Sequence, residues 1–185
     1  MSVELDEVDK IYREADCLFN REQVNEAIAV MGKNITAALK DTNPLVLCLM
    51  NGGLVIGGRL LTLLDFPLQL DYIHATRYCN STTGFGLEWI VKPRHELTGR
   101  TVLVVDDILD EGITLHEVLD FCRAQNASAV YSAVLVEKVH SRRSPPDINA
   151  DFIGLKVPDR YVFGYGMDYK AYLRNAPGIY AVAGT

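Results

Sequence analysis

The sequence predicts an α/β fold with a mostly parallel, twisted sheet flanked by helices, because short apolar runs alternate along the chain with stretches of helical periodicity. The clearest strand is TVLVVDD, residues 101–107, whose aliphatic side chains suit a strand buried on both faces. The next segment, ITLHEVLDFCRAQ, has the apolar spacing of an amphipathic helix. The 185 residues contain no linker, repeat or low-complexity run, so residues 1–185 are expected to form a single domain.

The other elements follow the same alternation. A helix is expected over residues 21–40, where apolar residues recur every third or fourth position until DTNP ends the pattern. The remaining expected elements, in chain order, are a buried strand at 45–50, a helix at 55–64, a strand at 68–78, a turn-rich loop at 79–86, an antiparallel excursion at 87–93, strands at 129–138 and 151–157, and an irregular Gly- and Tyr-rich tail at 159–185.

Composition narrows the class of protein. The net charge of −6 and the pI of about 5.2 weigh against a nucleic-acid partner, and HSRRSPP at 140–146 is the one basic cluster. The N-terminus is acidic without the apolar core of a signal peptide, and no apolar run is long enough to span a bilayer. The four cysteines are widely spaced, which indicates free thiols rather than a zinc site. We therefore expect a cytoplasmic protein without a membrane partner.

The segment VLVVDDILDEGIT, residues 102–114, carries the strongest functional signal. Asp106 and Asp107 end the predicted strand, where an open parallel sheet binds ligands. The following turn, with Gly112 in it, leads into a helix N-terminus, whose free N–H groups suit a phosphate. Carboxylates at the other end suit hydroxyl groups or a metal ion, so the segment fits a sugar phosphate. The alternative is that Asp110 only caps the helix and the two preceding acids are solvated.

This segment resembles the phosphoribosyl pyrophosphate (PRPP) motif of type I phosphoribosyltransferases. AVLVEKVHSRR at 133–143 is similar to the strand that carries the purine-contacting lysine of hypoxanthine-guanine phosphoribosyltransferases, and PDRYVFGYGMDYKAYLRN at 158–175 resembles their purine clamp. The likeness covers the chain from about Asp9 onwards and is greatest to bacterial enzymes of similar length. It implies a type I phosphoribosyltransferase fold, with a small hood lobe built from the chain ends and a mobile catalytic loop over residues 77–89.

The resemblance also implies a reaction. In purine salvage, the 5-phosphoribosyl group of PRPP passes to N9 of hypoxanthine or guanine, which gives IMP or GMP and pyrophosphate. PRPP and 6-oxopurine bases would be the ligands, Mg²⁺ the cofactor, and a homodimer or homotetramer the assembly. Two alternatives stay open: an enzyme that prefers xanthine, and a PRPP-sensing regulator of the same fold that binds RNA or DNA.

On the same resemblance, Asp106 and Asp107 bind the ribose hydroxyls and Mg²⁺. Asp110 is the catalytic group that accepts or shares the proton at N7, for which its pKa must be raised or its carboxylate held by hydrogen bonds. The residues implied to bind the 5′-phosphate are Asp110, Glu111, Gly112, Ile113 and Thr114.

The purine would be bound by Lys138 at O6, by stacking on Tyr161, and by the backbone of Val162. An ammonium group only donates hydrogen bonds, so Lys138 favours a 6-oxo group over the 6-amino group of adenine. Asp168 would also contact the purine and would hold Mg²⁺ on the pyrophosphate side. Taken alone, Lys138 fits an exposed strand end and Tyr161 fits a core position.

Pyrophosphate would be bound by Asn51, Gly52, Arg77 and Arg174, although Arg174 alone would pass for a surface charge. The resemblance allows a cis peptide between Met50 and Asn51. It also places Tyr78 at a tyrosine position of the mobile loop. Three residues depart from the family pattern and bear on PRPP affinity: Asn51 replaces Lys or Arg, Arg77 replaces Ser, and Glu111 replaces Ser or Thr, so that its carboxylate must point away from the phosphate.

Overall fold

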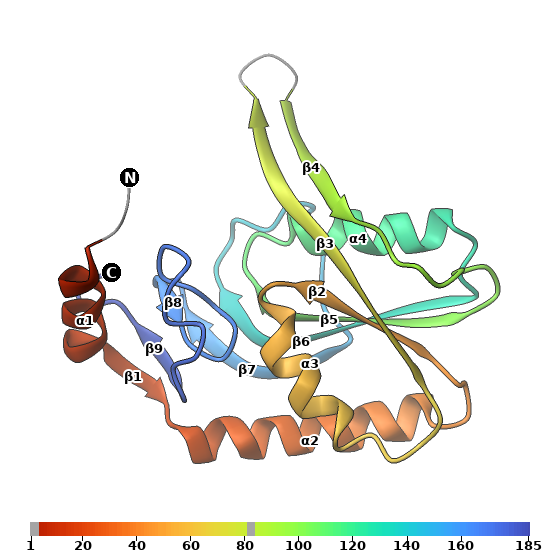
Figure 1. The fold of residues 1–185 in the computed structure, drawn as a ribbon, viewed down its shortest axis with the longest axis horizontal. Coiled ribbons are helices and arrows are strands. Elements are labelled where there is room, and N and C mark those ends of the chain that lie inside the picture. Colours follow the sequence, from red (N-terminus) through yellow and green to blue (C-terminus); the bar gives the residue numbers. More distant parts are fainter. Residues whose placement is uncertain (1–3, 81–83) are drawn as a thin grey trace.

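The computed structural model describes residues 4–80 and 84–185, with the side chains of 77–80 and 84–86 outside the description. Its larger sheet has the strand order β4-β3-β2-β5-β6-β7, and neighbouring strands are parallel except for the antiparallel pair β3 and β4 (Figure 1). The α/β fold class is thereby confirmed. The strands are β2 (Leu45–Met50), β3 (Gln69–Asn80), β4 (Gly84–Val91), β5 (Thr101–Leu109), β6 (Ala129–Val139) and β7 (Phe152–Pro158).

Helices cover both faces of this sheet, and β5 shows why. Leu103 and Val105 pack into the core under α2 (Arg21–Leu39) and α3 (Gly53–Leu61). Val102 and Val104 point the other way, into the core under α4 (Ile113–Ala124). The alternation of a strand thus buries aliphatic side chains on both faces, as the apolar run predicted.

A second, smaller sheet joins the two ends of the chain, as the expected hood lobe requires (Figure 1). It is antiparallel, with the order β1-β9-β8, and α1 packs beside it through Tyr12, whose ring meets the edges of Phe163 and Tyr180. The Arg160 guanidinium ties its two halves together by an ion pair of 2.6 Å to Asp16. The elements of this lobe are α1 (Leu5–Glu14), β1 (Asp16–Phe19), β8 (Val162–Phe163) and β9 (Ile179–Ala181).

Most element boundaries agree with the sequence pattern. The strand at 45–50 is confirmed residue for residue, and the helix expected at 21–40 ends at Leu39. The strand predicted at 101–107 continues to Leu109 because it pairs with β6 as far as Glu137. The predicted excursion at 87–93 is the antiparallel strand β4. Three features differ from expectation: α1 and β1 were not predicted, the tail contains β8 and β9 rather than irregular structure alone, and the loop expected at 79–86 is shorter because β3 runs to Asn80 and β4 begins at Gly84.

Three of the four cysteines, Cys17, Cys48 and Cys122, are free thiols; the side chain of Cys79 lies outside the description. Burial raises the pKa of the Cys48 and Cys122 thiols to about 11, so both stay protonated at neutral pH. Among the described helices, none is both long and apolar enough to cross a bilayer.

Candidate active site

An open cavity of about 510 Å³ lies where the carboxyl ends of β2, β5 and β6 meet the hood lobe. Most of the residues singled out from the sequence line it. Glu111 and Ile113 do not, and the side chains of Arg77 and Tyr78, like residues 81–83 of the expected mobile loop, lie outside the description. The predicted residues that do line the cavity are Asn51, Gly52, Asp106, Asp107, Asp110, Gly112, Thr114, Lys138, Tyr161, Val162, Asp168 and Arg174.

Two neighbouring buried acids form the floor of the cavity. Asp106 is 9% exposed and Asp107 is 7% exposed, so they are not solvated. Burial raises the pKa of both carboxyl groups, and the closeness of Asp107 raises that of Asp106 further, while the Arg174 guanidinium 3.9 Å away offsets part of the effect. Buried carboxylates need hydrogen-bond donors or a cation. The donor set therefore fits sugar hydroxyls and a hard divalent ion.

The turn after β2 packs directly on these acids. A Cβ atom on Gly52 would lie 2.1 Å from Oδ2 of Asp107, and one on Gly53 would lie 2.4 Å from the carbonyl oxygen of Val105. Side chains at both positions are therefore excluded. The peptide bond between Met50 and Asn51 is cis, in the position that the resemblance allowed.

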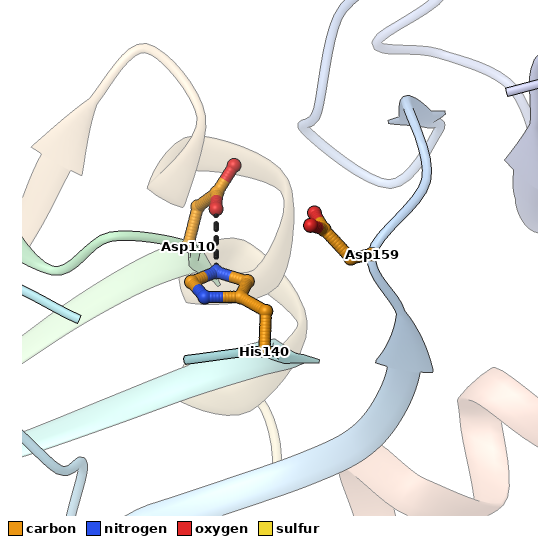
Figure 2. Close-up of side chains that lie close together, drawn as sticks. All are labelled: Asp110, His140 and Asp159. Carbon is orange, nitrogen blue, oxygen red and sulfur yellow. Dashed lines mark hydrogen bonds and ion pairs between the residues drawn. The ribbon is translucent and has the colours of Figure 1, made fainter. Parts of the chain in front are cut away.

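Asp110 is held by two donors. Nζ of Lys138 lies 2.7 Å from its Oδ2. Nε2 of His140 lies 2.8 Å from its Oδ1 (Figure 2). Burial alone would raise the pKa of Asp110, but the hydrogen bonds and charges of Lys138 and His140 together lower it below its usual value. The sequence left two possibilities for Asp110, a raised pKa or a carboxylate held by hydrogen bonds, and the structure shows the second.

The helix-cap alternative for Asp110 is wrong. Helix α4 begins after Gly112, which is its N-cap with φ of 90° and has no side chain to cap the helix, while the Asp110 carboxylate is held by Lys138 and His140. Glycine is also required there for space, because a Cβ atom would lie 2.5 Å from Cγ2 of Ile148. The α4 N-terminus thus faces the cavity with a backbone that can approach an anion closely.

Glu111 turns away from the cavity, as its departure from the family pattern required. Its carboxylate oxygen Oε1 accepts a hydrogen bond of 3.2 Å from Nη1 of Arg142, and its carbonyl oxygen accepts one of 2.8 Å from the backbone N–H of Ser144. The segment after β6 is therefore fastened to the turn that precedes α4. The negative charge of Glu111 is therefore neutralised by Arg142 and does not repel a phosphate in the cavity.

The hood side of the cavity carries an aromatic ring and an ion pair. Tyr161 is 45% exposed, and the edge of Tyr169 supports it at a ring-centroid distance of 5.6 Å. Asp168 is bound to Nη2 of Arg174 at 2.7 Å, and Nη1 of Arg174 donates to the carbonyl oxygen of Gly166 at 2.5 Å. An exposed ring beside a cavity can stack on a flat ligand, which a core tyrosine could not do.

Sequence reasoning missed His140, Arg142 and Asp159. Among the described residues, Asp110, His140 and Asp159 are the group of potential ligands that could share a metal ion, with ligand atoms within 4.8 Å of one another (Figure 2). Nη2 of Arg142, however, lies 2.6 Å from Asp159 and 3.7 Å from Asp110, so a fixed positive charge already serves these acids. The group also differs from the expected Mg²⁺ ligands. The position of HSRR directly after the Lys138 strand end was the one sequence signal for it.

Comparison with known proteins agrees with this geometry. The phosphoribosyl transferase domain model matches residues 15–171. The chain belongs to the phosphoribosyltransferase family. It is 33% identical over 163 residues to the hypoxanthine-guanine phosphoribosyltransferase of Bacillus subtilis, which covers 88% of this chain and 89% of that one.

Other members of the family are similar to a comparable degree. A hypoxanthine-guanine-xanthine phosphoribosyltransferase of Tritrichomonas foetus is 30% identical over 162 residues, 88% of each chain. The crystal structure of a hypoxanthine phosphoribosyltransferase from Staphylococcus aureus superposes with a TM-score of 0.86 at 25% identity, over 97% of this chain and 96% of that one. The expected type I fold is thereby confirmed, and the chain is a transferase of purine salvage.

Proposed function

We propose that this chain transfers the 5-phosphoribosyl group of PRPP to N9 of hypoxanthine or guanine. In the reaction the bond between C1′ and N9 forms, the bond between C1′ and the pyrophosphate oxygen breaks, and pyrophosphate leaves with the electron pair. One observation carries the proposal: a single cavity collects an acid pair, a helix N-terminus, a lysine and an exposed tyrosine at the ends of β5 and β6 and under the hood. The acid pair suits the ribose hydroxyls and the helix N-terminus suits the phosphate. The lysine suits O6, and the tyrosine suits the purine ring.

The ribose and its phosphate would bind along the segment after β5. Asp106 and Asp107 accept hydrogen bonds from the 2′ and 3′ hydroxyls, which relieves the cost of burying two adjacent carboxylates. The backbone N–H groups of residues 110–114 bind the 5′-phosphate at the α4 N-terminus. Because positive charge develops on the ribose as pyrophosphate departs, the same carboxylates stabilise the transition state more than the bound substrate.

The base would lie between the hood and the end of β6. Tyr161 stacks on the purine, Lys138 donates to O6, and the backbone of Val162 contacts the edge of the ring. As N9 bonds to C1′, Asp110 accepts or shares the proton that N7 of the purine carries, so that the ring of the product is neutral. Its lowered pKa makes it a weak base, so its contribution comes from position and charge more than from basicity.

Pyrophosphate would bind against Asn51, Gly52 and Arg174, with Arg77 as a further cation from β3. Asp106, Asp107 and Asp168 would hold Mg²⁺; all three line the cavity, as does Asp110, whose carboxylate is already held by Lys138 and His140. Such an ion, when bound, neutralises charge on the departing pyrophosphate.

We also propose that the chain works in the cytoplasm as a homodimer or homotetramer. Three large apolar side chains, Leu54, Leu70 and Tyr72, are 55%, 50% and 44% exposed. They line one hollow of about 600 Å³, and a second copy of the chain packed there would remove them from water. Light scattering after size-exclusion chromatography tests this assembly, and a monomeric mass at micromolar concentration would contradict it.

A spectrophotometric assay tests the function itself. Purified protein with PRPP and Mg²⁺ is offered hypoxanthine, guanine, xanthine and adenine in turn, with and without EDTA. Asp110→Asn keeps the shape of the side chain but removes its charge, and should lower kcat by about 10²-fold or more, the usual contribution of a positioned acid–base group. Turnover of hypoxanthine or guanine that the substitution removes supports the proposal. Absence of turnover with every base, in protein that still binds PRPP, would refute it.

A further inference from the structure

His140 lies just beyond β6 and has no assigned part in the reaction. Its side chain is 5% exposed and does not line the cavity, yet its Nε2 is 2.8 Å from Oδ1 of Asp110 (Figure 2). Buried histidines of this kind need partners for both ring nitrogens. Both ring nitrogens of His140 have such a partner, and the two contacts fix the orientation and the tautomer of the ring.

The tautomer follows from the second contact. The backbone N–H of Arg142 donates to Nδ1 of His140 at 2.9 Å, so Nδ1 is the acceptor nitrogen. A neutral imidazole then carries its proton on Nε2. The ring therefore donates its single N–H to the carboxylate of Asp110, and it cannot turn over without losing both hydrogen bonds.

The two donors of Asp110 are not equivalent. Lys138 lines the cavity and holds Oδ2, so Oδ2 is on the ligand side. His140 is behind the carboxylate and holds Oδ1. When a base arrives, Lys138 must turn part of its hydrogen bonding from Asp110 to O6, whereas His140 meets no ligand and keeps its bond. His140 is then the donor that stays with Asp110 through the reaction.

We propose that His140 is a positioning residue, which holds the Asp110 carboxylate at a fixed angle toward N7 of the purine. The inference rests on the proposed function. The surrounding charges support it, because Arg142 is bound to Glu111 at 3.2 Å and to Asp159 at 2.6 Å, so the backbone that holds the ring is itself fastened to two other segments. A positioning bond of this kind acts on the chemical step and leaves ground-state binding of PRPP unchanged.

The test compares two substitutions at this position with one elsewhere. His140→Phe keeps a flat ring but has no N–H, and His140→Gln keeps an N–H close to the place of Nε2. His116→Gln is the matched control, because His116 also pairs with an aspartate, Asp120 at 3.4 Å, but on the exposed side of α4. Melting temperature and PRPP affinity of each variant show whether it is folded.

His140→Phe should lower kcat for hypoxanthine by about 10- to 100-fold, the effect of one hydrogen bond to a charged group, with KM for PRPP within about twofold of wild type. His140→Gln should recover most of kcat, and His116→Gln should match wild type. A long-range ¹⁵N–¹H spectrum of the wild type should show the Nε2–H tautomer, and this reading does not depend on any variant folding.

The outcomes separate the two proposals. If wild type turns over hypoxanthine and folded His140→Phe keeps its kcat, the positioning role is wrong and the function stands. The Nδ1–H tautomer would also overturn it. If wild type turns over no base, the function fails and the inference fails with it.

Discussion

Replacing Gly166 by alanine should separate the hood from the sheet. Gly166 has φ of 112°, a conformation that costs a residue with a side chain about 1–3 kcal/mol. A Cβ atom there would also lie 2.2 Å from the carbonyl oxygen of Gly52 and 3.1 Å from Cβ of Asp107. The first of these neighbours is backbone and cannot rotate aside, so the hood turn and the turn after β2 must move apart.

The expected loss of stability is about 3 kcal/mol or more, because the clash adds to the strain, and for a chain of this size it corresponds to a drop in Tm of about 6–12 °C. Gly58→Ala is the matched control. It lies in α3 with nothing within 4 Å of the added Cβ atom, and it should stabilise the protein by about 0.5–1 kcal/mol.

Urea unfolding followed by the fluorescence of Trp89, the one tryptophan, measures both free energies. Calorimetry of PRPP binding adds a functional reading, because the shifted turn contains Gly52. A Gly166→Ala variant within about 0.5 kcal/mol of wild type would refute the close packing of hood and sheet, since that is the scatter of neutral substitutions.

Two further predictions concern charged groups. Lys138→Gln should lower kcat/KM for hypoxanthine by about 10- to 100-fold and reduce its preference over adenine, because an amide can accept as well as donate; assays with both bases check this, and an unchanged preference would remove Lys138 from base selection. Burial alone would raise the pKa of Asp71, but the His95 ring and three backbone N–H groups lower it to about 2. A depressed pKa stabilises the fold above the unfolded value near 4, so Asp71→Asn should cost about 2 kcal/mol at pH 7, with the difference from wild type shrinking as pH falls from about 4 to 2. Urea titrations at several pH values measure it, and a difference that does not vary with pH would contradict the assignment.

Local sequence patterns predicted those elements that have the same kind of surroundings in any fold of this class. The run at 45–50 must be buried on both faces in any parallel sheet, so its bounds were correct. Helix α1 was missed because its partners are distant in sequence: Val8 is its one buried residue, and its Tyr12 packs on Phe163 and Tyr180 from the other end of the chain. The apolar periodicity of a ten-residue segment does not indicate a contact with residues at the other end of the chain.

The site divides in the same way. Asp106, Asp107 and Asp110 were found because one strand and one turn present them together, and such a segment has few other uses. His140 was counted only as part of a basic cluster. Its contact with Asp110 depends on the backbone of Arg142 folding back to its ring, which a sequence without coordinates does not specify.

The charges of the cavity explain how binding of its ligands would be linked. Arg174 is bound to Asp168 at 2.7 Å, and Lys138 is bound to Asp110 at 2.7 Å, so these two proposed ligand-binding cations already have acidic partners. If Arg174 turns to pyrophosphate, Asp168 loses its partner, and a divalent ion is the group that would replace it. Asp110 likewise loses part of its pairing if Lys138 turns to O6 of the base, and His140 is then the donor that the protein itself supplies. A cavity whose lysine and arginine are paired with its own acids thus favours ligands that restore every charge, which PRPP with a cation and a 6-oxopurine would do together.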